Sequence, residues 1–383
     1  MTPPTDLAAA TPVAGPIPLV DLAAQHAQVA GEVAAGWARV TATGAFIHGP
    51  DVTAFEEEFA AFSGAEHCVG VANGTDALEL ALRARGIGAG DEVILPANTF
   101  IATAEAVSRA GARPVLADCD LAYLLIDPER VVERLTERTR AVMAVHLYGQ
   151  MAPVHALAEV LPAGVDLIED AAQSQGATHH GRGSGSVGAV AGTSFYPGKN
   201  LGAYGDAGAV LTSDVDTAAT LRALRDHGGT RKYTHDLVGM NSRLDTVQAV
   251  VLRAKLARLD AWNEQRRAAA RRYDDLLAGH AGIRLPAALP GNEHVWHLYV
   301  VRLARRDAVL ARLHAAGIGA GIHYPHPVHL LGAYADLGHG PGDFPVAEAA
   351  AGEIVSLPLF PGITAAQQER VAAEVLAAVD AAA

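Results

Sequence analysis

Short apolar runs and amphipathic segments alternate along much of the chain. Runs rich in Val, Ile and Leu predict buried strands, and segments with apolar residues every three or four positions predict helices between them. Strands are expected over residues 67–71, 92–95, 113–117, 141–145, 165–168, 191–195 and 209–211. Helices are expected over residues 20–41, 53–62, 76–85, 99–110, 128–135 and 154–160.

Strands that alternate with helices predict an α/β fold with a mostly parallel sheet whose two faces are covered by helices. In such sheets, ligands bind beyond the carboxyl ends of the strands. Residues that directly follow a predicted strand are therefore the first candidates for a functional site.

The pattern changes near residue 245. A long helical stretch rich in Arg, Ala and Leu is expected from there past residue 273, and then a strand over 295–303 and helices over 306–315 and 365–379. We predict a large domain over residues 17–247, and a linking helix with a small α+β domain over residues 248–383. Residues 1–16, rich in Pro, Ala and Thr, are expected to be a flexible tail.

Composition excludes several classes of protein. Half of the 383 residues are apolar and 19% are charged, so the chain can bury a sizeable core. No long apolar run free of charges and breaks predicts a membrane span, and the absence of a basic residue before Arg39 argues against a secretory leader. The net charge of −13 opposes binding to nucleic acid. We expect a cytoplasmic protein in which Cys68 and Cys119 are buried thiols.

The basic residues are unevenly divided between the two types. Only Lys199, Lys232 and Lys255 are lysines among the 29 basic residues. Arginine keeps its charge at every workable pH, whereas lysine can react as a neutral amine. Each of the three lysines is therefore a candidate for chemistry that needs a free amine.

The first candidate motif is Asn73-Gly74-Thr75-Asp76, between a predicted strand and a predicted helix. The first turn of a helix offers free N–H groups and the positive end of the helix dipole. Gly74 lets a ligand approach the backbone, and the Thr75 hydroxyl adds a donor. The motif predicts a phosphate site, and an ordinary helix cap is the alternative.

The second candidate motif contains Asp170 and Gln173, which follow the predicted strand over residues 165–168. A carboxylate at the end of a buried strand can hold a proton on a ring nitrogen. Gln173 lies three residues further on and can reach the same ligand. An aspartate that merely caps a loop is the alternative.

The third candidate motif runs over residues 193–202 and presents Lys199 after a Pro-Gly turn. A lysine in apolar surroundings can lose its proton and form a Schiff base. A solvated surface amine is the alternative, against which the apolar flanks and the scarcity of lysine argue.

These three motifs, in this order, resemble the attachment points of pyridoxal phosphate in fold-type-I aminotransferases. The chain resembles most closely the sugar aminotransferase family named for the DegT, DnrJ, EryC1 and StrS proteins, from about residue 17 to residue 360. The matching stretches are residues 18–22, 88–94, 99–100, 146–150, 169–173, 194–200 and 241–245.

The resemblance implies a large domain with a mixed, mostly parallel sheet and a smaller C-terminal domain, with pyridoxal 5′-phosphate as the cofactor. Lys199 is implied as the Schiff-base lysine and as the general acid and base, and Asp170 as the partner of the ring nitrogen. The other implied contacts are Gln173 near the ring hydroxyl, Phe100 on the ring face, Gly74, Thr75 and Ser194 at the phosphate, and Asn241 at the phosphate of a second subunit. A homodimer with shared active sites follows.

The resemblance also implies the substrates. Glutamate or glutamine would donate the amino group, and a nucleotide-linked keto-6-deoxy sugar would accept it at C3, near His323, Tyr324 and Tyr196. Arg243 is a further candidate for substrate binding. A 4-keto sugar, a keto-cyclitol and a non-catalytic cofactor-binding regulator remain alternatives, whereas dehydratase relatives carry histidine in place of Lys199.

Two further patterns predict no site. Residues 183–188 satisfy the dinucleotide fingerprint G-x-G-x-x-G but follow a polar loop instead of a strand. His323, His326 and His329 have the spacing of metal ligands, but prolines interrupt any helix that would align them. We therefore expect neither a dinucleotide nor a metal.

Overall fold

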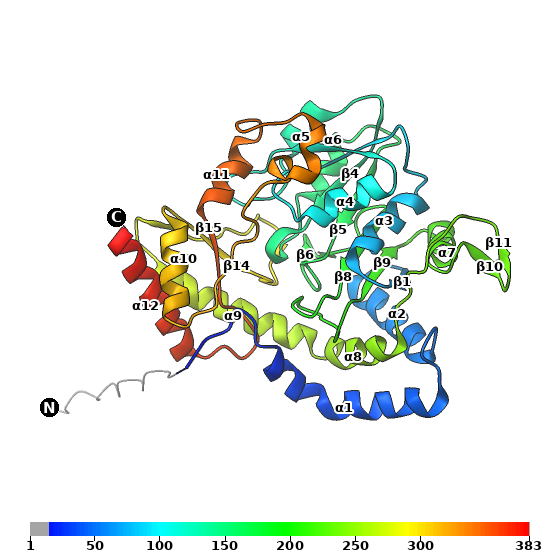
Figure 1. Cartoon of the computed structure of the whole chain (residues 1–383), viewed down its shortest axis with the longest axis horizontal. Coiled ribbons are helices and arrows are strands. Elements are labelled where there is room, and N and C mark those ends of the chain that lie inside the picture. The colour runs from blue at the N-terminus through cyan, green and yellow to red at the C-terminus, as the bar shows by residue number, and fades with distance from the viewer. Residues whose placement is uncertain (1–14, 383) are drawn as a thin grey trace.

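The structure, a computed structural model, describes residues 15–382, so that the expected tail falls outside the described residues except for its last two positions. A seven-stranded sheet with the order β1-β9-β8-β5-β4-β2-β3 forms the centre of this part of the chain (Figure 1). Six of the seven strands run in the same direction, and β9 runs opposite to them. The predicted mostly parallel α/β fold is therefore confirmed. The strands are β1 (His67–Val71), β2 (Glu92–Pro96), β3 (Arg113–Ala117), β4 (Thr139–Val145), β5 (Asp166–Asp170), β8 (Val190–Ser194) and β9 (Gly208–Thr212).

Helices cover both faces of this sheet. On one face, side chains of α3 (Gly74–Ala84), α4 (Ile101–Arg109) and α7 (Val215–Leu224) join a single apolar cluster with every second residue of the strands. The other face packs against α5 (Pro128–Arg134), α6 (Val154–Val160), α2 (Pro50–Ser63) and α8 (Thr246–Leu256). The long helix α1 (Leu22–Thr43) lies along α8 (Figure 1). Cys68 and Cys119 are buried free thiols, as expected.

The C-terminal part of the chain builds a second core, at the left of Figure 1. A three-stranded antiparallel sheet, β12-β14-β15, packs against three helices. Its elements are β12 (Ile283–Arg284), β14 (Tyr299–Leu303), β15 (Ile354–Leu357), α9 (Leu259–Leu277), α10 (Arg306–Ala315) and α12 (Ala365–Ala382). Ile17 also packs in this core, so the N-terminal segment returns to the C-terminal sheet. The division at residue 247 stays a prediction.

Two sequence expectations differ from the structure. The long helical stretch from residue 245 is divided into α8 and α9, because α8 packs under the large sheet and α9 turns toward the second core. The strand expected over residues 295–303 is only β14, since the amides of Val295 and Leu298 bond to the carbonyls of Gly149 and Tyr148.

Several short elements were not expected from the sequence. Helix α7 carried a signal, because the Asp214 side chain caps its first turn and apolar residues follow at helical spacing. The others are α11 (Pro345–Glu353), the 3₁₀ turns η1 (Leu147–Gly149), η2 (Val328–Leu330) and η3 (Gly332–Leu337), the hairpin of β10 (Gly229–Arg231) and β11 (Thr234–His235), and β6 (Thr178–His179), β7 (Arg182–Gly183) and β13 (Asn292–Glu293). None of the helices within residues 15–382 has the length and apolar character needed to cross a bilayer.

Candidate active site

Asp170 ends β5 at the carboxyl edge of the large sheet and is buried. Its Oδ2 accepts a hydrogen bond from Thr103 Oγ1 at 2.8 Å, and its Oδ1 accepts one from the Ala172 amide at 3.2 Å. Burial raises the pKa of the Asp170 carboxyl, while the Thr103 hydroxyl, the Ala172 amide and the charge of Lys199 oppose that rise. The edge of the sheet therefore carries a buried carboxylate held by few donors.

The preceding residue, Glu169, has a different environment. Its Oε2 lies 2.7 Å from His146 Nε2, and His146 Nδ1 accepts a hydrogen bond from the Ala152 amide. Burial raises the pKa of Glu169, but the contacts with His146 and with the loop amides outweigh this effect. The pKa of the Glu169 carboxyl is therefore lower than its usual value. Those amides, which belong to Gly185, Val187 and Gly188, lie at 2.7–2.9 Å from the Glu169 oxygens. The glycine pattern that matches a dinucleotide fingerprint thus binds a carboxylate of its own chain.

Gln173 links three parts of the site. Its Oε1 accepts a hydrogen bond from the Tyr148 amide at 2.7 Å, and its Nε2 donates one to Tyr324 Oη at 3.1 Å. The Phe100 ring, half exposed at the start of α4, lies 5.1 Å from the Tyr324 ring between centroids. Phe100, Gln173 and Tyr324 therefore lie together beside Asp170.

Lys199 lies in the turn that follows β8, and its side chain is half-buried. Its backbone amide donates to the Tyr196 carbonyl at 2.9 Å and closes the turn. Burial lowers the pKa of the Lys199 amine to about 8, although the nearby Asp170 carboxylate opposes this change. A substantial neutral fraction is available at mildly alkaline pH, which is what a nucleophilic amine requires.

The N-terminus of α3 lies against the end of β8. Gly74 is the first residue of α3, and a Cβ at this position would come within 2.5 Å of Ser194 Cβ. The Asn73 side chain accepts from the Asp76 amide and caps the helix, and Thr75 is half-buried in the first turn. Gly74, Thr75 and Ser194 are thus brought together at a helix N-terminus, which is a favourable place for a phosphate.

His323 directly precedes Tyr324 and is close enough to Lys199 to feel its charge. Its Nδ1 is 2.8 Å from Ser356 Oγ on β15, and its carbonyl accepts a hydrogen bond from Tyr148 Oη at 2.6 Å. Burial and the charge of Lys199 lower the pKa of His323 to about 4. The ring is therefore neutral at physiological pH.

The remaining candidates are Tyr196, Asn241 and Arg243. Tyr196 is 59% exposed, and its backbone joins the group because its amide donates to Ser194 Oγ at 3.2 Å. Asn241 is exposed, and Arg243 donates to Asp226 Oδ1 at 2.8 Å. Across residues 15–382, no hydrogen bond or ion pair connects the side chain of Asn241 or Arg243 to the other candidates. Both line a separate groove with Ala72 and Asp206.

Residues 28–376 match the DegT/DnrJ/EryC1/StrS aminotransferase family. The chain belongs to this family. One relative, the Erythromycin biosynthesis sensory transduction protein EryC1 of Saccharopolyspora erythraea, is 47% identical over 91% of this chain and 95% of its own length. The dTDP-3-amino-3,4,6-trideoxy-alpha-D-glucose transaminase of Streptomyces venezuelae is also 47% identical, over 93% of this chain and 94% of its own.

A solved structure agrees with the fold. The structure of S. venezuelae DesV in complex with a ketimine intermediate superimposes with a TM-score of 0.93 at 46% identity. The match covers 95% of this chain and 98% of that one. The resemblance drawn from the sequence motifs is therefore confirmed, and the protein is an aminotransferase.

The sequence motifs missed two residues that contact the candidate site residues, Thr103 and Tyr148. Thr103 was hidden inside a predicted helix, although it and Thr99 are hydroxyl residues four apart with oxygens 2.7 Å from each other. Tyr148 lies in a matching stretch, but its contacts with Gln173 and His323 depend on segments far away in the sequence.

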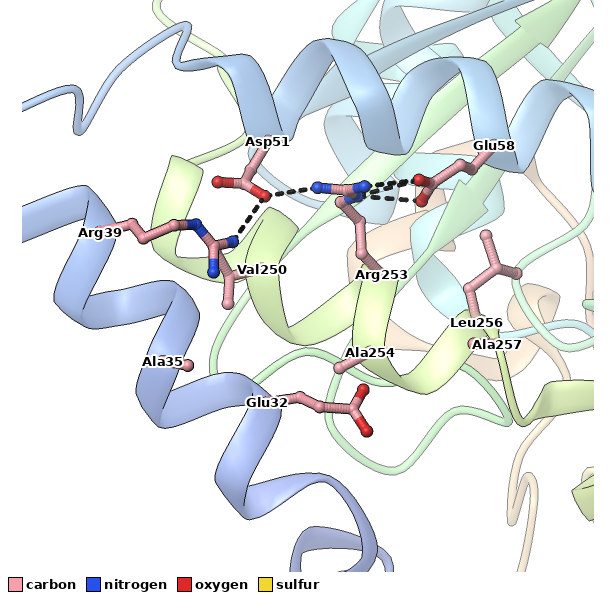
Figure 2. Close-up of a pocket in the computed structure, with 10 residues that line it drawn as sticks. All are labelled: Glu32, Ala35, Arg39, Asp51, Glu58, Val250, Arg253, Ala254, Leu256 and Ala257. Carbon is pink, nitrogen blue, oxygen red and sulfur yellow. Dashed lines mark hydrogen bonds and ion pairs between the residues drawn. The ribbon is translucent and has the colours of Figure 1, made fainter.

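A cavity of about 650 Å³ lies elsewhere on the aminotransferase, between α1, α2 and α8. Figure 2 shows Arg253 of α8 between Asp51 and Glu58 of α2, with N–O distances of 2.6 and 2.7 Å. Glu32 of α1 pairs with Arg258. Because the charged side chains of this cavity are already paired, it offers none of the reactive groups found at the sheet edge.

Proposed function

We propose that this aminotransferase binds pyridoxal 5′-phosphate and transfers an amino group from glutamate or glutamine to C3 of a nucleotide-linked keto-6-deoxy sugar. The observation that carries the proposal is the juxtaposition of Asp170, a buried carboxylate, with Lys199, an amine whose pKa is lowered to about 8. The name of the S. venezuelae relative, a transaminase of a dTDP-linked 3-amino sugar, supports the acceptor class.

The residues present fit the cofactor. Asp170 forms no ion pair with any Lys, Arg or His within the described chain, so it is free to hold a proton on the pyridine nitrogen. Only glycine at position 74 lets the first turn of α3 lie against Ser194, because a Cβ there would come within 2.5 Å of Ser194 Cβ. In this proposal Gly74, Thr75 and Ser194 hold the phosphate, Gln173 lies at the ring hydroxyl, and Phe100 covers one ring face.

The side chains of the site have separate roles in the proposed reaction. When bound, pyridoxal phosphate supplies an electron-withdrawing ring that stabilises negative charge on the donor's α-carbon. Asp170 keeps the ring nitrogen protonated, and Thr103 keeps Asp170 ionised. Lys199 Nζ, in its neutral form, would accept the proton from that α-carbon. Neutral His323 and the Tyr324 hydroxyl are proposed to contact the acceptor sugar.

We also propose a homodimer with shared active sites. Asn241 is exposed and Arg243 half-buried at the groove beside Ala72, and within residues 15–382 neither side chain has a hydrogen bond or ion pair to the cofactor candidates. Their exposure supports the expectation that Asn241 reaches the phosphate of a second subunit. Arg243 is proposed to contact substrate next to it, and Tyr196 is proposed to line the sugar side.

An absorbance spectrum of the purified protein, recorded before and after addition of glutamate or glutamine, tests this proposal. We expect a cofactor band that one donor converts and that a 3-keto nucleotide sugar restores. If a 4-keto sugar or a keto-cyclitol restores the band instead, the acceptor belongs to that class. A protein whose spectrum neither donor changes would contradict the transaminase proposal and favour a non-catalytic regulator.

A further inference from the structure

Lys255 is a buried lysine without a counter-ion. Of the three lysines, Lys232 is exposed in the β10–β11 hairpin and Lys199 belongs to the active site. Lys255, on α8, is only 3% exposed and pairs with no carboxylate among residues 15–382. Lysine is almost never buried unless its charge is paired, because desolvation of the ammonium is unfavourable. Such a residue decreases the stability of the fold, which points to a role other than stability.

The Lys255 ammonium binds the loop that carries Lys199. Its Nζ donates to the Gly202 carbonyl at 2.6 Å and lies 4.7 Å from the centre of the Tyr204 ring. A charged donor makes a stronger hydrogen bond than a neutral one, and the ring face adds attraction for the cation. The contact therefore fixes one carbonyl three residues after Lys199.

The position of Gly202 determines the position of the whole turn. A Cβ on Gly202 would lie 2.2 Å from the Pro197 carbonyl oxygen, so the two ends of the turn are in direct contact. The Ala203 amide also donates to the Phe195 carbonyl at 2.8 Å. Residues 197–202 thus form a closed turn with Lys199 inside it, and a shift of Gly202 moves the base of the lysine.

Neighbouring residues of α8 and α9 hold the same turn through neutral groups. Gln248, two helical turns before Lys255, bonds to both the amide and the carbonyl of Tyr204, at 2.9 and 3.2 Å. Asn263 of α9 accepts from Asn200 Nδ2 at 2.9 Å. Lys255 is the charged member of this set, and it binds closest to the contact that closes the turn.

We propose that Lys255 is a positioning residue, whose ammonium holds the Gly202 carbonyl and so directs the amine of Lys199 toward the cofactor site. This inference rests on the proposed role of Lys199. A purely structural residue should stabilise the fold, whereas Lys255 is expected to decrease stability and to increase the reactivity of Lys199.

The test compares Lys255→Met with wild type and with Val375→Ala. Met keeps the length and apolar stem but removes the charge and the donor. Val375 is fully buried in the second core and shows what loss of stability alone does to the readouts. For each protein, apoprotein is mixed with pyridoxal phosphate, the lysine linkage is reduced with borohydride over time, and the labelled lysine is mapped by mass spectrometry. Thermal unfolding of each apoprotein and steady-state kinetics complete the set.

We expect Lys255→Met to unfold at a higher temperature than wild type, yet to label Lys199 about tenfold more slowly and to have a kcat about tenfold lower, with KM changed less than twofold. Val375→Ala should unfold at a lower temperature and label at the wild-type rate. Wild-type labelling and kcat in Lys255→Met would overturn the inference. Absence of label on Lys199 in wild type would instead overturn the proposed role of Lys199.

Discussion

At the scale of single residues, Glu169 and Asp170 show how adjacent carboxylates acquire different roles. Consecutive side chains of a strand point to opposite faces. Glu169 meets His146 and three loop amides, which hold its pKa low and fix it as a structural anion. Asp170 meets one hydroxyl and one amide, and burial raises its pKa. The carboxylate with fewer donors is the one that stays available to a ligand.

Thr103→Val should move the acid limb of the kcat/KM profile to higher pH by about one unit, since a hydrogen bond to a charged group contributes about 1.5–3 kcal/mol. The Thr103 hydroxyl favours ionised Asp170, so its removal raises the pKa of that carboxyl further. Asp170 is then protonated at a pH where the wild type is still charged. The pH profile measures the shift, and Thr103→Ser, which keeps the hydroxyl, is the control. An unmoved acid limb in the Val variant would remove Thr103 from this role.

Lys255→Met should be more stable than wild type by an amount that depends on pH. Burial lowers the pKa of Lys255 from its ordinary 10.5 to about 8, which corresponds to a destabilisation of about 3 kcal/mol at neutral pH. Above pH 8 the folded chain releases this proton while the unfolded chain keeps it, so wild-type stability rises toward pH 10.5.

Denaturant unfolding of both proteins at several pH values checks this prediction. The difference in unfolding free energy between Lys255→Met and wild type should be largest at neutral pH and should shrink as the pH rises toward 10.5. A constant difference across that range would show that the Lys255 charge does not cause the destabilisation.

At the scale of elements, the phosphate position depends on how closely α3 approaches β8. The first residue of α3 touches the last residue of β8, and within the same pair of elements a Cβ on Gly192 would lie 2.7 Å from Leu78 Cδ2. Two glycines, Gly74 and Gly192, therefore let the helix lie directly on the strand. Because neither glycine has a side chain, the N-terminus of α3 can lie over the end of the strand.

Gly74→Ala should raise the dissociation constant of pyridoxal phosphate about tenfold or more, a loss of about 1.4 kcal/mol of binding energy. The new Cβ would lie 2.5 Å from Ser194 Cβ, and the helix must move away from its phosphate contacts. Fluorescence or absorbance titration of the apoprotein measures the change.

Gly31→Ala is the matched control, because Gly31 lies on α1 with open space where its Cβ would be. It should stabilise the helix by about 0.5–1 kcal/mol and leave cofactor affinity as in wild type. Equal affinity of the Gly74 variant and wild type would show that the close contact is not needed for binding.

At the scale of the whole molecule, the candidate site draws on both cores, and Asn241 and Arg243 lie apart from it. Lys199, Asp170 and Gln173 come from the large sheet, and His323 is held by Ser356 of the second sheet. Asn241 is exposed near the β10–β11 hairpin, which projects at the right of Figure 1. This arrangement supports the proposed homodimer, in which each site combines residues of two chains.

Mixed variants test this proposal directly. Lys199→Ala and Asn241→Ala should each lose most activity, the first completely and the second at least tenfold. After the two proteins are unfolded together and refolded, random pairing should restore about a quarter of wild-type activity, because half of the dimers then contain one intact site. Activity assays and sizing by light scattering measure the outcome. No recovery in mixed dimers would show that each site lies within a single chain.

The sequence by itself determined the order of the main elements, the family and the candidates for the chemistry. Alternating strands and helices are local patterns, because hydrophobic periodicity reflects burial of one segment at a time. Asp170 and Lys199 were identifiable as candidates because each lies at or shortly after the end of an apolar strand, where α/β folds place their ligands. Family motifs such as residues 169–173 are also contiguous, so a single chain was sufficient to find them.

Only the tertiary structure decided what surrounds those residues. Thr103 reaches Asp170 and Lys255 reaches Gly202 across long stretches of sequence, and no local pattern encodes which distant segment a side chain meets. The glycines of residues 183–188 match a dinucleotide fingerprint, but the structure shows that the amides of this loop bind the Glu169 carboxylate. That contact depends on the position of the loop beside β5, which the local pattern does not encode. The antiparallel direction of β9 was decided in the same way, since strand direction depends on the path of the connecting chain.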